Sequence, residues 1–166
     1  MGETSPAEIL EGRLYIASAV QASNYELVTN LDVTHIVNCS RSCNFDGTGT
    51  NPFSATIAYC SIGFADNATS DLTEALEQTW NFIDTALSSH PRWVVLVHCA
   101  SGISHSVALV CHYLMKKENM SFQDSISFIR SRHPAAAPSS HFVQQLKLVD
   151  LQLHKQRGDF SEKRDE

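Results

Sequence analysis

Residues 93–106 read WVVLVHCASGISHS, and the predicted architecture follows from this stretch. Its first five residues form a continuous apolar run after Pro91, which is typical of a β-strand buried on both faces. A short loop containing Gly102 follows, and apolar residues at helical spacing begin at Val107. The succession of strand, loop and helix predicts an α/β fold with a ligand site at the carboxyl end of this strand.

The segments on either side continue the alternation of strands and helices. Short runs rich in β-branched and aromatic residues predict further strands at 14–16, 34–39 and 57–62. Apolar residues that recur every three or four positions predict a helix capped by Asp71, another that begins at Ser121, the helix after the loop, and a final helix. No internal repeat divides the chain, so we expect a single domain.

Composition and charge narrow the classes of function. With 166 residues, 43% of them hydrophobic, the chain is predicted to be globular. A net charge of −6 argues against nucleic-acid binding and against a polybasic membrane anchor. We expect neither a secretory signal nor a membrane span, because the apolar runs are far shorter than about 20 residues. Five scattered cysteines favour a reducing compartment, so we expect a cytoplasmic protein, with the nucleus as the alternative.

Cys99 is the candidate nucleophile of the chain. It stands where the apolar strand ends and the loop begins, so backbone N–H groups and a helix N-terminus are expected around its side chain. Such an environment binds anions and lowers the pKa of a cysteine thiol. A thiolate held in an anion-binding loop is suited to attack phosphorus and form a phosphocysteine.

The pattern H-C-x-x-G-x-S-x-S over residues 98–106 resembles the signature of the dual-specificity branch of the cysteine-dependent protein tyrosine phosphatases. Residues 14–19 are similar to the family's LYLGS strand, and residues 34–39 to its THILNV strand. Residues 131–146 are similar to its closing segment around SRRP. The resemblance therefore covers most of the chain.

The resemblance implies an α/β fold with a central, mostly parallel, twisted sheet of about five strands flanked by helices. The domain is expected over residues 8–154, between an N-terminal tail of residues 1–7 and a charged C-terminal tail of residues 155–166. The implied reaction is hydrolysis of phosphotyrosine and phosphoserine or phosphothreonine in proteins. We therefore expect a phosphorylated protein as the partner and a monomer as the default state.

The resemblance also assigns roles to individual residues. Cys99 would be the nucleophile, and Asp66 would protonate the leaving oxygen and later help to activate water. Ser106 would hydrogen-bond the thiolate and help to expel it, and His98 would support the loop from behind. The phosphate-binding loop would consist of Ala100, Ser101, Gly102, Ile103, Ser104 and His105.

His105 is a departure from the family pattern, which has Arg six residues after the cysteine. An imidazole does not reproduce the bidentate, permanently charged guanidinium. Loss of one such donor costs roughly 10²–10³ in rate. Three interpretations remain: a phosphatase-like protein with little or no activity that still binds phosphate, an enzyme that uses His105 as a cation, and a substitution introduced in the laboratory. The non-catalytic alternative is a phosphoprotein-binding or scaffold protein.

Three smaller predictions concern the surroundings of the site. Cys39 ends a strand that lies beside the Cys99 strand in this family, so it is a candidate redox partner, although two reduced thiols are the expected resting state. Eight His and five Cys show no C-x2-C or H-x3-H spacing, so no metal and no cofactor is expected. Residues 139–141 are Ser-Ser-His, where the family often has a segment that contains Asn. We expect this difference to perturb a supporting contact near the site.

Overall fold

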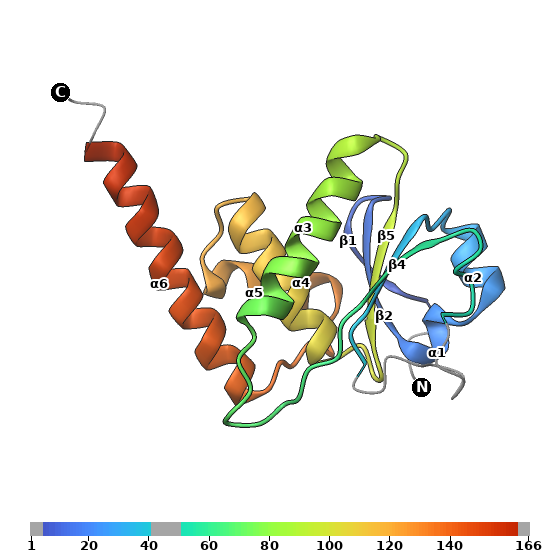
Figure 1. Cartoon of the computed structure of the whole chain (residues 1–166), viewed down its shortest axis with the longest axis horizontal. Helices are drawn as coiled ribbons and strands as arrows, with labels where there is room; N and C mark the ends of the chain where they lie inside the picture. The colour runs from blue at the N-terminus through green and yellow to red at the C-terminus, as the bar shows by residue number, and fades with distance from the viewer. Residues whose placement is uncertain (1–4, 41–50, 163–166) are drawn as a thin grey trace.

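The computed structural model describes residues 5–40 and 51–162 of the chain. Its elements follow the predicted alternation of strands and helices (Figure 1). The strands are β1 (Ala7–Leu10), β2 (Leu14–Ser18), β3 (His35–Asn38), β4 (Ala58–Ser61) and β5 (Val95–Cys99). The helices are α1 (Ala19–Ala22), α2 (Tyr25–Asn30), α3 (Thr73–Ser89), α4 (His105–Lys117), α5 (Phe122–Arg132) and α6 (Ser140–Glu162).

The strands form one five-stranded sheet in the order β1-β2-β5-β3-β4. β1 pairs antiparallel with β2, and the other neighbouring strands pair in parallel. The apolar run predicted as a doubly buried strand is therefore β5, at the centre of the sheet with β2 and β3 on its two sides. The predicted α/β class and the mostly parallel five-stranded sheet are confirmed.

Helices cover both faces of the sheet, as Figure 1 shows. α3, α4, α5 and α6 lie on one face, where Val95 and Val97 of β5 point into the larger core. α1 and α2 lie on the other face, where Leu96 and Ile36 pack into a smaller core with Val28 of α2. Successive side chains of β5 thus pack into opposite cores, because side chains alternate along a strand. This double burial explains why residues 93–97 lack polar side chains.

The structure corrects the expected ends of the domain. Ala7, assigned to the N-terminal tail, begins β1 and is buried against the core. The C-terminal stretch from residue 155 was expected to be a tail, but α6 continues through it to Glu162. Among the described side chains, Leu153 is the last one packed against the larger core. The helix itself continues beyond it to Glu162.

The start of α3 also differs from the prediction. The N-cap residue is Leu72, which makes no side-chain capping bond, and the helix begins at Thr73. Asp71 lies one residue earlier, where its carboxylate accepts a hydrogen bond from the backbone N–H of Thr73 at 2.8 Å. The predicted cap at Ser121 is confirmed, because its side chain accepts from the backbone N–H of Asp124. Within the part of the chain that the structure describes, no helix combines the length and apolarity needed to cross a membrane.

Candidate active site

Cys99 is the last residue of β5, at the carboxyl end of the central strand. The parallel neighbour β2 ends level with it, since Ser18 pairs with Cys99 in the register. On the other side, Cys39 follows β3, and its backbone N–H donates to the carbonyl oxygen of His98 at 2.9 Å. The carboxyl ends of three strands thus hold the start of the loop in place. The predicted ligand-site edge of the sheet is where Cys99 lies.

The loop after Cys99 directs hydrogen-bond donors at the thiol. The backbone N–H of Gly102 lies 3.2 Å from Sγ of Cys99, and Oγ of Ser106 lies 3.3 Å from it. Burial of the 3% exposed side chain would by itself raise the pKa of Cys99. Hydrogen bonds from the Ser106 hydroxyl and from the N–H groups of Ser106, Gly102 and Ser104 outweigh this effect and hold the pKa below its ordinary value. The loop therefore favours a thiolate.

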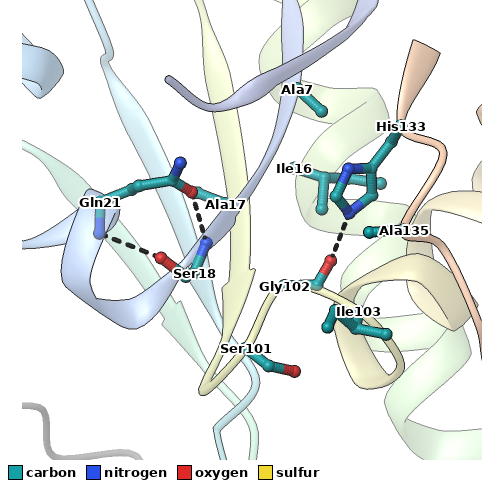
Figure 2. A pocket seen from close by; sticks show the side chains of 10 residues that line it. All are labelled: Ala7, Ile16, Ala17, Ser18, Gln21, Ser101, Gly102, Ile103, His133 and Ala135. Carbon is teal, nitrogen blue, oxygen red and sulfur yellow. Dashed lines mark hydrogen bonds between the residues drawn. The ribbon is translucent and has the colours of Figure 1, made fainter. Parts of the chain in front are cut away.

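Gly102 is required by the shape of the loop. Its φ is +73°, a left-handed conformation that side chains rarely adopt, and a Cβ atom would lie 2.8 Å from the backbone C and O of Ala17. The carbonyl oxygen of Gly102 lies 2.8 Å from Nε2 of His133, which is buried (Figure 2). The loop is thus held on one side by β2 and on the other by the segment after α5, with the Gly102 N–H directed at the thiol.

We expect the substitution Ser106→Ala to raise the pKa of the Cys99 thiol. The variant loses the hydroxyl that stabilises the thiolate and keeps the backbone N–H groups that do the same. Since the folded-state pKa is held low by these bonds, the thiolate fraction at a given pH should fall, and the alkylation profile should move to higher pH. The measurement is the rate of iodoacetamide labelling of Cys99 against pH, with Cys99→Ser as the blank. An unchanged profile would show that Ser106 does not stabilise the thiolate.

His98 lies behind the loop within β5 and is buried. Burial lowers the pKa of His98 to about 4, against a smaller opposite effect of a backbone hydrogen bond with Cys99, so the ring is neutral at neutral pH. Cys39 is also buried, and its Sγ lies 3.1 Å from the carbonyl oxygen of His98. No disulfide joins Cys39 to Cys99. Cys39 thus contacts the β5 residue that directly precedes Cys99.

Asp66 lies in the segment between β4 and α3, and its carboxylate is exposed. The hydroxyl of Ser139 donates to Oδ1 of Asp66 at 2.6 Å. Ser139 belongs to the stretch for which we expected a perturbed supporting contact, yet its backbone N–H also donates to Oγ of Ser104 in the loop, at 3.1 Å. Ser139 therefore connects the Asp66 side chain to the loop that follows Cys99.

The side chain of His105 faces the Asp66 segment. His105 begins α4, and its Nε2 lies 3.1 Å from the carbonyl oxygen of Phe64. Its ring packs against two aromatic rings, with centroid distances of 4.8 Å to Phe64 and 4.9 Å to Phe142. Because a carbonyl oxygen can only accept, Nε2 carries the hydrogen of this bond. The residue expected to replace the signature Arg is thus engaged with protein groups.

A cavity of about 320 Å³ lies beside the loop, on the side of β1 and β2 (Figure 2). Its walls combine the loop with β1, β2 and α1 and with the segment after α5. The lining residues are Ala7, Ile16, Ala17, Ser18, Gln21, Ser101, Gly102, Ile103, His133 and Ala135. None of these described lining residues is a Lys or an Arg. Among the side chains that the structure describes, no group of three His, Cys, Asp or Glu residues is placed to hold a metal ion.

The residues that connect the parts of the candidate site were not apparent from the sequence. Phe64, Phe142 and His133 are distant in the chain from the residues they contact. A weak signal existed for Ser139, because a serine directly before a helix is a preferred N-cap, and its Oγ does accept from the backbone N–H of Phe142 at 3.3 Å. Nothing in the sequence indicated that the same hydroxyl also donates to Asp66.

Comparisons with known proteins agree with this arrangement. Residues 14–151 match the family model "Dual specificity phosphatase, catalytic domain". Dual specificity protein phosphatase 1B of Arabidopsis thaliana is 31% identical over 162 residues, which cover 92% of each chain. Several longer relatives are matched over only 16% to 38% of their own length.

Two solved structures have the same fold. A mouse protein described as a dual specificity phosphatase, solved in complex with zinc tungstate, has a TM-score of 0.79 and 26% identity, with 95% of each chain covered. The human tyrosine phosphatase-like serine/threonine/tyrosine-interacting protein has a TM-score of 0.77 and 27% identity, covering 90% of this chain and 97% of the other. The loop after Cys99, the sheet order and these matches agree, and the chain belongs to the dual-specificity branch of the cysteine-dependent protein phosphatases.

Proposed function

We propose that this chain hydrolyses phosphomonoesters of phosphorylated proteins, on tyrosine and on serine or threonine, through a phosphocysteine and with slow turnover. The observation that supports this most directly is the thiol of Cys99, which lies within reach of the Gly102 N–H and the Ser106 hydroxyl and has a lowered pKa. The mouse relative solved with tungstate supports an oxyanion site in this fold. The backbone N–H groups of residues 100–105 form the proposed phosphate-binding loop.

The first step is attack of the Cys99 thiolate on phosphorus. The S–P bond forms while the P–O bond to the substrate breaks, and the electron pair of that bond goes to the leaving oxygen. Protonated Asp66 gives its proton to that oxygen, so the product leaves as a neutral hydroxyl. The N–H groups of the loop hold the phosphoryl oxygens, where negative charge develops.

The second step returns the enzyme to its starting state. A water molecule attacks the phosphorus of the phosphocysteine, and the Asp66 carboxylate accepts its proton. The S–P bond breaks, and its electron pair goes to sulfur. The Ser106 hydroxyl, 3.3 Å from Sγ, hydrogen-bonds the departing thiolate. The thiolate and the carboxylate supply the nucleophile and the acid, so the proposed mechanism uses no metal or cofactor.

Slow turnover follows from His105. In related enzymes the equivalent Arg is expected to bind two phosphoryl oxygens, but here the imidazole donates to the carbonyl oxygen of Phe64. The loop N–H groups, the thiolate and Asp66 remain, so the expected rate is reduced by roughly 10²–10³ and is not abolished. His98 is the proposed support of the loop from within β5.

Binding of phosphoproteins without turnover is the second candidate function. The observation that favours it is the contact of His105 with Phe64 and Phe142. An imidazole held by these groups does not serve to stabilise the transition state of phosphoryl transfer. One structural relative is named an interacting protein rather than a phosphatase. A phosphate-binding loop without the guanidinium would still offer its N–H groups to a phosphorylated side chain.

Kinetics of the chain beside Cys99→Ser test the proposed function. We expect the chain to release phosphate from p-nitrophenyl phosphate above the level of Cys99→Ser, and an acid quench to trap a phosphoryl group on Cys99. The variant should show neither, because its hydroxyl is a weaker nucleophile in the same loop. Equal rates for the two proteins, together with binding of phosphate by both, would contradict the enzyme and support the binding protein.

Cys39 is the proposed redox partner of Cys99. A peroxide would oxidise the Cys99 thiolate to a sulfenic acid, and the Cys39 thiol would then attack that sulfur, forming the disulfide and releasing water. Sγ of Cys39 lies 3.1 Å from the carbonyl oxygen of His98, the residue directly before Cys99, which supports the pairing. We further propose that the protein works as a monomer in the cytoplasm or nucleus, where reducing conditions keep both thiols reduced.

A further inference from the structure

The acid loop, residues 63–70, connects β4 to α3 and contains Asp66. It has no regular secondary structure. Nε2 of Gln145 donates to the carbonyl oxygen of Ser70 at the end of the loop, and two further hydrogen bonds from outside reach its first half. His105 donates to the carbonyl oxygen of Phe64 at 3.1 Å, and Ser139 donates to Oδ1 of Asp66 at 2.6 Å.

The contact of His105 combines a hydrogen bond with aromatic packing. The Phe64 and Phe142 rings lie 5.6 Å apart, and the imidazole contacts both of them. The ring is half-buried, and its hydrogen-bonding Nε2 is directed at the acid loop. His105 is therefore held in one orientation by groups that belong to the acid loop and to α6.

We propose that His105 is a positioning residue, which fastens the acid loop through Phe64 so that Asp66 is held near the leaving oxygen. The inference rests on the proposed function, in which Asp66 is the acid. A proton can be transferred only within hydrogen-bond reach, and a misplacement of about 1 Å can cost roughly 10²-fold in rate. His105, which stands where the family has Arg, lacks the guanidinium. It supplies instead an anchor for the acid loop at Phe64, two residues from Asp66.

The leaving group reveals whether His105 acts through the acid. A phenolate of high basicity, such as that of phenyl phosphate, needs a proton as it departs, whereas p-nitrophenolate is stable as an anion and needs little help. Loss of a phosphate ligand would slow both substrates equally, because both carry the same phosphoryl group. Loss of an anchor of the acid should slow phenyl phosphate selectively.

Two variants separate the hydrogen bond from the packing. His105→Phe keeps a ring against Phe64 and Phe142 and removes the donor, and His105→Gln restores an N–H donor without the ring. We expect His105→Phe to lower kcat on phenyl phosphate about tenfold, with less than a threefold change on p-nitrophenyl phosphate. His105→Gln should recover part of the loss. In an Asp66→Asn background, His105→Phe should cause no further loss. An equal loss on both substrates, or an undiminished loss in Asp66→Asn, would overturn the inference.

Two measurements on the Cys99→Ser protein test whether His105 anchors the acid loop, and they need no turnover. If His105 anchors the loop, His105→Phe should speed hydrogen exchange of the backbone N–H groups of residues 64–66 about tenfold and leave the Kd for inorganic phosphate within twofold. If exchange is unchanged and phosphate binding weakens, His105 is a phosphate ligand and the inference is wrong. A chain without turnover would contradict the proposed function alone, because exchange and phosphate binding still report on the anchor.

Discussion

The substitution His105→Arg should raise kcat on p-nitrophenyl phosphate by roughly 10²–10³-fold. A guanidinium at the start of α4, next to the phosphate-binding loop, would add two parallel N–H donors and a permanent charge where the transferring phosphoryl group develops negative charge. The gain corresponds to about 2.7–4 kcal/mol of transition-state stabilisation. Any loss of the Phe64 contact would cost little with this substrate, because its leaving group needs little protonation.

Two controls identify the source of that gain. His105→Lys supplies a charge without the bidentate fork, so its kcat should lie between those of the native chain and His105→Arg. The double variant Cys99→Ser/His105→Arg should have no activity, since the gain depends on the thiolate. A rise of less than tenfold in His105→Arg, or activity that survives in the double variant, would contradict the assignment of position 105 and Cys99 to one phosphoryl-transfer site.

Gly102→Ala should be the most damaging single substitution in the loop. A methyl group there would lie 2.8 Å from backbone atoms of Ala17 and 2.9 Å from the N of Ser18, and it would also be strained by the φ of +73°. Left-handed strain of about 1–2 kcal/mol and overpacking of about 1–3 kcal/mol together lower the free energy of unfolding by roughly 3 kcal/mol. Because the backbone of β2 is held in the sheet, the loop should shift instead, and the Gly102 N–H should move away from Sγ of Cys99.

The measurements are the urea midpoint and the alkylation profile of Cys99. Gly12 offers a matched control, since its φ is +61° and a Cβ atom there would meet nothing within 4 Å. Gly12→Ala should therefore cost about 1 kcal/mol from backbone strain alone and leave the alkylation of Cys99 unchanged. Equal urea midpoints for the two variants would show that contact with Ala17 and Ser18 is unimportant at Gly102.

The elements that the sequence predicted best are those with the strongest local signals. β5 was recognisable because a strand buried on both faces needs an uninterrupted apolar run, and Ser121 because its capping bonds are made within one turn. β1 was missed since its four residues are too short for a periodic pattern and are stabilised by pairing with β2. α1 and α2, with four and six residues, were missed for the same reason.

In the candidate site, too, features within one short segment were predictable from the sequence, and contacts between distant segments were not. The sequence by itself determined that a cysteine follows a central strand and precedes a glycine loop and a helix, because a thiol, its N–H donors and the helix start lie within eight residues, 99–106. The lowered pKa of Cys99 follows from those local bonds. Tertiary structure alone decided which groups the His105 side chain contacts. The direction of its ring depends on Phe64 and Phe142, and the restraint on Asp66 depends on Ser139, 73 residues further along the chain. Such contacts arise only when the sheet brings distant loops to one edge, so no local pattern records them.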